Sequence, residues 1–300
     1  MLDNLSVVIP CYNESAIIAD IIEKLMSINS KWEIIIINDG STDNSLELIS
    51  KYPIKLINNH YNTGNGASVK KGILAATREY VVLMDGDGQH DPGDIPKLLE
   101  YVNRYDMVVG ARINKKALSR IRSLGNFLMI RLAEYLTKQR IGDLTSGFRV
   151  FKRSAALPFL PLFPARYSYP TTLTLCMIKS GMNIQYVYLD SIVRRKQGKS
   201  SLNPLMDGMR FINIMIRVIM LYSPQTIFLP VGILVLLVSI VLTVHKMIFF
   251  HRFTPNIGLF YLASLFTILF GLLAEQIANM RFELIEMTRD RYNQNKTDDL

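Results

Sequence analysis

The stretch YVVLMDGDGQHDPGD, residues 80–94, passes from five mainly apolar residues directly into Asp85, Gly86 and Asp87. Asp and Gly tolerate tight turns, so the stretch by itself is compatible with an ordinary turn after a strand. The alternative is a ligand site built at the end of that strand. The segments around the stretch decide between these two interpretations.

The first 110 residues alternate between strand-like runs and helical patterns, which predicts βαβ units and a doubly wound, mainly parallel α/β sheet. The predicted strands are Ser6–Pro10, Glu33–Asn38, Ile54–Asn58, Tyr80–Met84 and Asp106–Val109. The predicted helices are Ala16–Met26, Asn44–Ser50, Ala67–Thr77 and Ile95–Val102. Right-handed crossovers place the carboxyl ends of parallel strands at one edge, where open α/β sheets bind ligands. Polar residues follow three of these strands, in PCYNE (10–14), NDGSTD (38–43) and DGDGQH (85–90), so we expect them to converge on one crevice.

Beyond residue 110 the pattern predicts helices at Leu118–Thr137 and Thr171–Ser180, and a strand at Asn183–Leu189. Between the two helices, GDLTSGFRVFKRS (142–154) is typical of a polar turn. A basic segment, RRKQGKSS (194–201), precedes residues 204–222, where apolar side chains recur at helical spacing. Residues 204–222 fit a helix lying in a membrane interface or, alternatively, a core-facing amphipathic helix.

Two apolar runs, Thr226–Phe250 and Ile257–Ala278, are each long enough to cross a hydrocarbon core of roughly 30 Å. They predict a transmembrane helical hairpin; the alternative is a pair of buried core helices, which are usually shorter. We therefore expect four parts, namely a catalytic domain (1–202), an interfacial helix (203–225), the hairpin (226–280) and a tail (281–300).

The first residues lead almost directly into a strand, without a basic leader or a cleavage site, so we expect no secretory signal and a cytosolic catalytic part. Two passes return the tail to the same side of the membrane. The positive-inside rule agrees with this orientation, although Lys246 and Arg252 in the connecting loop weaken the signal. The basic residues of the tail are Arg281, Arg289, Arg291 and Lys296.

Composition limits the chemistry further. The two cysteines, Cys11 and Cys176, fit a reducing compartment and give neither a disulfide framework nor a zinc set. A net charge of +9 suits partners that carry phosphate or anionic lipid groups, although charge alone does not distinguish these from nucleic acid. The glycine patterns of dinucleotide-binding folds and of P-loops do not occur, so neither design fits.

The crevice offers acids in place of a glycine-rich cradle. Asp85 and Asp87 stand one residue apart at a strand end and present oxygen ligands toward one point, to which Gln89 adds a third. Such hard oxygen donors suit Mg²⁺ or Mn²⁺ bound jointly with a diphosphate. The cation would act as a Lewis acid toward a departing nucleoside diphosphate.

The ordered motifs PCYNE, NDGSTD, DGDGQH, DLTSGFRVF and RKQGKSS resemble glycosyltransferase family 2, and within it the polyprenyl-phosphate branch that includes dolichol-phosphate mannose synthase. The resemblance covers roughly residues 5–222. It implies a GT-A fold, a nucleotide-sugar donor, a divalent metal and inversion at the sugar carbon. The interfacial helix and the transmembrane hairpin would follow the GT-A domain.

The resemblance also implies roles for individual residues. Nucleotide and donor binding falls on Pro10, Tyr12, Glu14, Asp39, Asp85, Gly86 and Gln89. The metal set is Asp85, Asp87 and Gln89, and the catalytic set is Asp87, Arg112 and Arg195. The acceptor phosphate would meet Arg112, Arg120, Arg122, Ser123, Arg195 and Lys199, although any one of these cations is also compatible with a solvated surface position.

The sequence departs from the family pattern at two positions, and it leaves the roles of His90 and Glu275 open. The loop after the third strand reads NTGNG, with Asn65 where the family often has lysine, so we assign that loop no phosphate contact. The usual basic residue of the late motif is displaced, which leaves Lys199 as the candidate. His90 is either a general base or a structural residue, and an acceptor phosphate with a second pKa of about 6 needs no base. Glu275 is either functional within the membrane or solvated at its interface.

The sequence therefore predicts a metal-dependent glycosyltransferase of the hexosyltransferase class. It would move one sugar from a UDP- or GDP-sugar to a dolichyl or undecaprenyl phosphate, on the cytosolic face of the cell membrane or an endomembrane. The alternatives are a processive polysaccharide synthase, whose Q-x-x-R-W motif does not surround the single Trp32, and a non-catalytic membrane-anchored subunit. No nucleic-acid partner is expected, a homo-oligomer is left open, and the motifs do not name the sugar.

Overall fold

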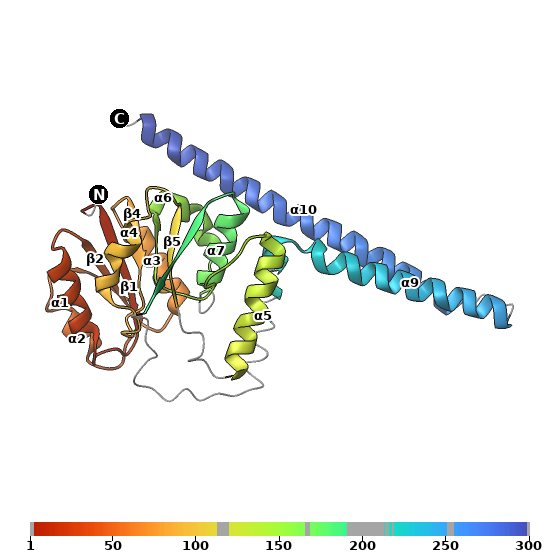
Figure 1. Ribbon diagram of the computed structural model, residues 1–300, viewed down its shortest axis with the longest axis horizontal. Helices are drawn as coiled ribbons and strands as arrows, with labels where there is room; N and C mark the ends of the chain where they lie inside the picture. Colours follow the sequence, from red (N-terminus) through yellow and green to blue (C-terminus); the bar gives the residue numbers. More distant parts are fainter. Residues whose placement is uncertain are drawn as a thin grey trace. The chain divides into compact units, whose positions relative to one another are not determined.

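The computed structural model describes residues 3–112, 120–165, 169–190, 213, 216–217, 219–250 and 255–298 (Figure 1). The chain divides into two compact units. The first comprises Met1–Gly208 and Glu286–Leu300, and the second comprises Met209–Ile285.

The first unit is built on a seven-stranded sheet with the strand order β3-β2-β1-β4-β6-β5-β7. β1 is parallel to β2 and β4, β2 is parallel to β3, and β5 is parallel to β7, whereas β6 runs antiparallel between β4 and β5. Runs of Val and Ile buried on both faces explain why the central strands form a covered, mainly parallel sheet. The strands are β1 (Leu5–Cys11), β2 (Glu33–Asn38), β3 (Lys55–Asn58), β4 (Tyr80–Leu83), β5 (Met107–Arg112), β6 (Arg149–Lys152) and β7 (Ile184–Leu189).

Helices cover both faces of this sheet, with α1 on one side and α7 on the other (Figure 1). Buried residues of α1 and α4 join alternate residues of β1, such as Val7 and Ile9, in one core. α3 packs on β1 and β2 from the opposite face, and at Gly72 it approaches so closely that a Cβ would overlap Val8. The helices are α1 (Ile18–Ile28), α2 (Ser45–Ile49), α3 (Asn65–Ala75), α4 (Ile95–Leu99), α5 (Arg120–Thr137), α6 (Arg153–Ala156) and α7 (Tyr169–Lys179), with 3-10 turns η1 (Pro92–Asp94) and η3 (Leu157–Leu162).

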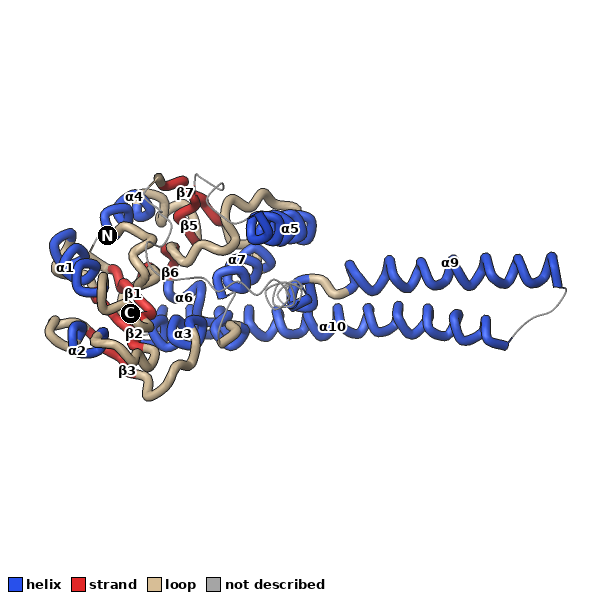
Figure 2. The backbone as a smooth tube through the Cα atoms, turned by 90° about the horizontal axis from the view of Figure 1, so that it is seen from below, coloured by secondary structure: helices blue, strands red, loops and turns tan. Residues whose placement is uncertain are grey.

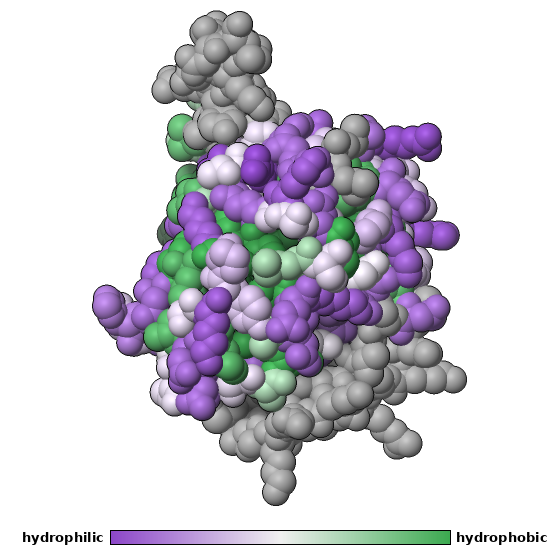
Figure 3. Space-filling view, turned by 90° about the vertical axis from the view of Figure 1, so that its left-hand side faces the viewer, coloured by the Kyte–Doolittle hydropathy of each residue, from purple (hydrophilic) through white to green (hydrophobic). Residues whose placement is uncertain are grey.

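On the face shown in Figure 3, on the side of α1, hydrophilic residues predominate, and hydrophobic areas lie between them. In α1 the buried positions are Ile18, Ile21, Ile22 and Leu25, at helical spacing, and the exposed ones include Asp20 and Lys24. This is the pattern of a helix that covers a sheet and faces solvent with its other side.

The predicted α/β fold is confirmed, and each strand or helix predicted in the first 110 residues forms within a few residues of its expected bounds. One prediction is wrong. Residues 142–154 are not only a polar turn, because Arg149–Lys152 forms β6. The four-residue strand RVFK is too short and too rich in charge to show an apolar pattern, and its burial comes from strands distant in sequence.

The second unit contains α9 (Gln225–Phe250) and α10 (Pro255–Asp298), which lie side by side over the part of α10 in this unit (Figure 2). Gly232 packs on Ile268, and the Ser264 hydroxyl donates to the Gly232 carbonyl at 2.8 Å. Both helices are long and apolar enough to cross a membrane, over Gln225–Phe249 and Asn256–Leu284. Only 11% and 17% of their most apolar windows are buried, which disfavours core helices of a soluble protein.

The helix predicted at 204–222 falls largely outside the described residues. Its described residues, 213, 216–217 and 219–222, are helical. Ile216 and Met220 are exposed, whereas Ile219 and Leu221 are buried. The interfacial placement of this helix stays a prediction.

Candidate active site

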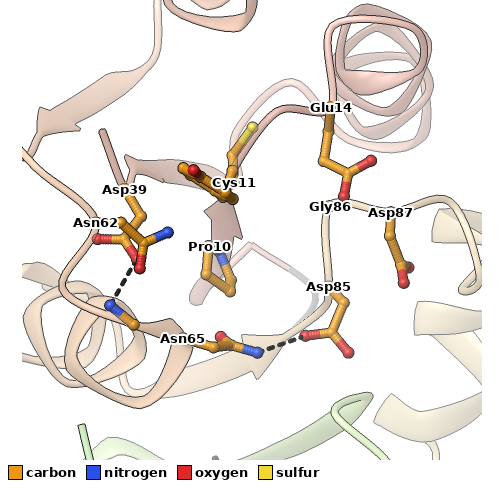
Figure 4. Close-up of a pocket in the computed structure, with 11 residues that line it drawn as sticks. Pro10, Cys11, Glu14, Asp39, Asn62, Asn65, Asp85, Gly86 and Asp87 are labelled. Atoms are coloured by element: carbon orange, nitrogen blue, oxygen red, sulfur yellow. Dashed lines mark hydrogen bonds between the residues drawn. The ribbon is translucent and has the colours of Figure 1, made fainter. Parts of the chain in front are cut away.

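A pocket of about 380 Å³ opens at the carboxyl end of β1 and at the turn that follows β4 (Figure 4). The loops after β2 and β3 complete its wall. Its lining residues are Pro10, Cys11, Tyr12, Glu14, Asp39, Asn62, Gly64, Asn65, Asp85, Gly86 and Asp87. Six of the seven predicted donor-binding residues therefore lie together, as does Asp87 of the metal set, and Gln89 is the exception.

The loop that carries Tyr12 and Glu14 is fixed to the loop after β2. Asn13, which has a positive φ of 56°, accepts a hydrogen bond from the Thr42 backbone N–H at 2.8 Å, and its own N–H donates to the Ser41 hydroxyl at 3.0 Å. The Glu14 N–H donates to the Ser45 hydroxyl at 3.0 Å. These contacts hold Tyr12 at the pocket with 44% of its surface exposed, available for stacking on a flat ring.

Asp39 lines the pocket, but its carboxylate mainly holds the neighbouring loop in place. It accepts hydrogen bonds from the backbone N–H groups of Thr63 and Gly64, each at 2.8 Å, from the Thr63 hydroxyl at 2.7 Å and from the Asn59 amide at 2.8 Å. Burial alone would raise the pKa of Asp39, but these hydrogen bonds outweigh burial and lower it. The carboxylate is therefore ionised and fixes the loop that contains Asn62, Gly64 and Asn65.

The family pattern predicts no phosphate contact for that loop, yet three of its residues belong to the pocket wall. Asn65 donates to a carboxylate oxygen of Asp85 at 3.5 Å (Figure 4). Cys11 is a further wall residue that sequence reasoning missed. The positions of these residues in the sequence could have predicted that they line the pocket. The loop follows β3 at the ligand-binding edge of the sheet, and Cys11 ends β1 next to Pro10.

Asp85 and Asp87 follow β4 and are both half-buried at the pocket. Burial raises the pKa of Asp85, while the Asn65 amide and the positive charges of Arg149 and Arg112 act in the opposite direction. Asp87 accepts a hydrogen bond from the Gln89 backbone N–H at 3.1 Å. The arrangement places two carboxylates on one wall of the pocket. Burial makes ionisation of Asp85 unfavourable, and a bound cation would offset that cost.

This donor set fits a hard divalent cation that shares its coordination with a diphosphate. The described residues contain no group of three or more His, Cys, Asp or Glu in a metal-binding arrangement, so a closed site of the zinc type is not formed by them. Mg²⁺ is commonly held by one or two carboxylates, with substrate phosphates and water completing the shell. Asp85 and Asp87 meet that requirement.

Arg112, at the end of β5, is the one predicted acceptor residue whose side chain the structure describes. Its Nε lies 3.5 Å from a carboxylate oxygen of Asp143, and its charge acts on both Asp85 and His90. Arg120, Arg122 and Ser123 fall in the first turn of α5, with side chains outside the description. Arg195 and Lys199 lie outside the described residues.

His90 is buried and stacks on Phe148, with ring centroids 5.2 Å apart. Burial lowers its pKa to about 4, and the nearby charges of Arg112 and Arg149 act in the same direction, although Asp87 and Asp143 oppose them. A neutral, enclosed imidazole favours the structural interpretation over a general base. Glu275 accepts hydrogen bonds from the Ser223 hydroxyl at 3.3 Å and the Gln225 N–H at 3.2 Å, so it links α10 to the start of α9.

A crystal structure of glucosyl-3-phosphoglycerate synthase from Mycobacterium tuberculosis, in complex with Mn²⁺ and UDP-glucose, has the same fold. The TM-score is 0.58 with 19% sequence identity, over 72% of this chain and 78% of that chain. The mixed sheet with an acidic pocket at its carboxyl edge thus defines a protein of the GT-A fold class.

The chain belongs to glycosyl transferase family 2, which matches residues 6–157, and residues 223–280 match the GtrB C-terminal hairpin. A dolichyl-phosphate beta-glucosyltransferase of Trichomonas vaginalis is 30% identical over an alignment of 182 residues, and the match covers 51% of this chain and 53% of that protein. An undecaprenyl-phosphate 4-deoxy-4-formamido-L-arabinose transferase of Pectobacterium atrosepticum is 32% identical over an alignment of 164 residues, and the match covers 51% of this chain and 50% of that protein. The chain spans about half the length of these curated relatives.

Proposed function

We propose that this protein transfers one sugar from a nucleoside-diphosphate sugar to a polyprenyl phosphate at a membrane surface. The observation that carries the proposal is the pocket that brings Asp85 and Asp87 together with Pro10, Tyr12 and Glu14, in a chain that also has two helices able to cross a membrane. The relatives named above act on dolichyl and undecaprenyl phosphates, which supports a lipid phosphate as acceptor.

The donor would lie along the pocket wall, with its base at the side of Tyr12 and its diphosphate at the acidic pair. Asp85 and Asp87 would hold Mg²⁺ or Mn²⁺, which supplies Lewis-acid neutralisation of the departing diphosphate. The Mn²⁺ and UDP-glucose in the related crystal structure support this assignment. Gln89 stays a predicted third ligand, although its side chain does not line the pocket.

An oxygen of the acceptor phosphate would attack the anomeric carbon as the bond from that carbon to the diphosphate breaks, with inversion. A phosphate monoester is largely ionised near neutral pH, so the step requires cations to hold the nucleophile and no group to remove a proton. Arg112 is suited to this because a guanidinium binds phosphate oxygens in bidentate fashion. We assign Arg120, Arg122, Ser123, Arg195 and Lys199 to the same acceptor site as predictions from the sequence.

The hairpin would anchor the protein as an integral membrane protein, with the catalytic domain and both termini on the cytosolic side. The GT-A domain (1–202), the interfacial helix (203–225), the hairpin (226–280) and the tail (281–300) are the proposed working parts. Retention of the full chain in the membrane after an alkaline carbonate wash, with protease access to the first unit from the cytosolic side, tests the arrangement. Protection of that unit from protease in sealed inside-out vesicles, whose cytosolic face points outward, would contradict it.

A donor screen tests the activity itself. The full chain in detergent would be given labelled UDP- and GDP-sugars, with undecaprenyl or dolichyl phosphate and Mg²⁺ or Mn²⁺. The proposal expects one donor to yield a labelled lipid and an equal amount of free nucleoside diphosphate. Donor binding without a labelled lipid for any pair would favour a non-catalytic subunit, and a polymeric product would favour a processive synthase.

A further inference from the structure

The segment 143–149, between α5 and β6, contacts both sides of the site. Asp143 faces Arg112 at the end of β5, and Gly147 lies against Asp85 after β4. β6 then pairs with both of these strands, with Arg149 opposite Leu83 on one side and Val109 on the other. The segment therefore joins the acidic wall to the predicted phosphate-binding arginine.

The first half of this segment is internally fixed. One Asp143 oxygen accepts hydrogen bonds from the backbone N–H groups of Thr145 and Ser146, at 3.0 and 3.1 Å, and from the Thr145 hydroxyl at 3.0 Å. The fully buried Ser146 donates through its hydroxyl to the Gly110 carbonyl of β5 at 2.6 Å. The Asp143 carboxylate is thus held at a defined place beside β5.

A buried guanidinium fixes the second half. Arg149 donates through Nε to the Ser146 carbonyl at 3.1 Å, and a terminal amino group adds a second contact to the same carbonyl. Its other terminal nitrogen reaches the Pro170 carbonyl at 2.9 Å and the Thr174 hydroxyl at 3.1 Å in α7. These bonds tie the segment to the helix behind the sheet, so it has little freedom to move away from Arg112.

The remaining oxygen of Asp143 approaches Arg112 through Nε, at 3.5 Å. The side chains are 9% and 29% exposed, so water screens this ion pair less than it screens a surface pair. An arginine has five N–H donors, four of them on its two terminal nitrogens. The buried Nε of Arg112 has no hydrogen-bond partner among the described residues, so its restraint by Asp143 is an electrostatic attraction, which does not occupy the terminal amino groups.

We propose that Asp143 is a positioning residue, which fixes the Arg112 guanidinium so that its terminal amino groups meet a phosphate of the donor or of the acceptor. The inference rests on the proposed function, because it assumes that both substrates carry phosphate. Asp143 itself touches neither substrate, and its effect passes through Arg112.

Two variants separate positioning from simple loop stability. Asp143→Asn keeps an oxygen that can accept from Thr145 and Ser146 but removes the charge that faces Arg112. Thr145→Val removes the hydroxyl bond to Asp143 and leaves the carboxylate in place. Both variants should melt close to wild type. The measurements are kcat, KM, and calorimetric binding of UDP, GDP and farnesyl phosphate to the full chain.

Asp143→Asn should lower kcat about tenfold, a coupling typical of residues in direct contact, whereas Thr145→Val stays within about twofold. Weaker binding of farnesyl phosphate would show that Arg112 meets the acceptor, and weaker binding of the nucleotide that it meets the donor. Adding Asp143→Asn to Arg112→Ala should cause no further loss. Unchanged kcat and affinities in Asp143→Asn, or losses that add in the double variant, would overturn the proposal. A wild-type protein without transfer activity would contradict the proposed function instead, and the binding measurements would still decide the role of Asp143.

Discussion

Gly147 lies directly against the carboxylate of Asp85, so closely that a Cβ at position 147 would overlap the Asp85 oxygens. Residue 147 precedes β6 and Asp85 follows β4, and the antiparallel pairing of these strands brings the two together. Gly147 has no positive φ, so the requirement for glycine comes from this close approach and not from backbone conformation.

Gly147→Ala should therefore displace Asp85 and lower transfer by about a hundredfold, the loss expected when a reacting group moves by roughly 1 Å. Titration with Mn²⁺ and donor would show a higher metal requirement. Gly258→Ala is the matched control, since a Cβ there meets nothing within 4 Å. Equal activity of the two alanine variants would show that Asp85 need not keep its place.

Asp39→Asn should destabilise the protein and weaken donor binding. The carboxylate accepts hydrogen bonds from two backbone N–H groups, one hydroxyl and one amide. In asparagine an NH₂ group replaces one of the accepting oxygens, so two hydrogen-bond donors would then face each other. The expected cost is about 1–3 kcal/mol for a buried group left unsatisfied. Thermal unfolding and calorimetric titration with donor measure the two effects. Weak donor binding with unchanged stability would instead indicate a direct contact of Asp39 with the nucleotide.

Cys11 should react slowly with iodoacetamide although it lines the pocket. Burial raises the pKa of its thiol to about 12, and the negative charge of Glu14 adds to the effect. The raised pKa favours the neutral thiol, so at pH 8 about one molecule in ten thousand carries the thiolate. Mass spectrometry should show a rate that keeps rising between pH 7 and 10. A plateau near pH 8.5, typical of an exposed cysteine, would contradict a neutral pocket wall.

Glu275→Ala should lower the stability of the hairpin without lowering the turnover of the folded protein. The carboxylate accepts from Gln225, the first residue of α9, and loss of such a cap costs about 1 kcal/mol. Glu275→Gln keeps an acceptor oxygen and should behave nearly as wild type in thermal unfolding. A loss of kcat without a loss of stability would indicate that Glu275 has a functional role.

The sequence was sufficient to predict those site residues that lie at the carboxyl ends of parallel strands. Pro10, Glu14, Asp39 and Asp85 each lie at or just after a strand end, and parallel strands bring such ends together. Buried Val and Ile runs identified the strands because their apolar pattern is local.

Other parts depend on contacts between distant segments, which local patterns do not contain. β6 is short and charged, so its place between β4 and β5 could not be recognised from RVFK. The same insertion brings Asp143 to Arg112 and Gly147 to Asp85 across the sheet. Asn65 differs from the family lysine, so the family pattern predicts no ligand contact for it, although it lies on the pocket wall.

The proposed function requires Asp85 and Asp87 for sugar transfer to a lipid phosphate. The most direct test compares the full-length wild type with Asp87→Asn in the transfer of labelled sugar to polyprenyl phosphate, with and without a metal chelator. Asp91→Asn is the matched control, because Asp91 lies on the same turn but pairs with Lys24 at 2.7 Å outside the pocket. We expect transfer by the wild type and by Asp91→Asn, and none by Asp87→Asn or with chelator. Undiminished transfer by Asp87→Asn would contradict this requirement.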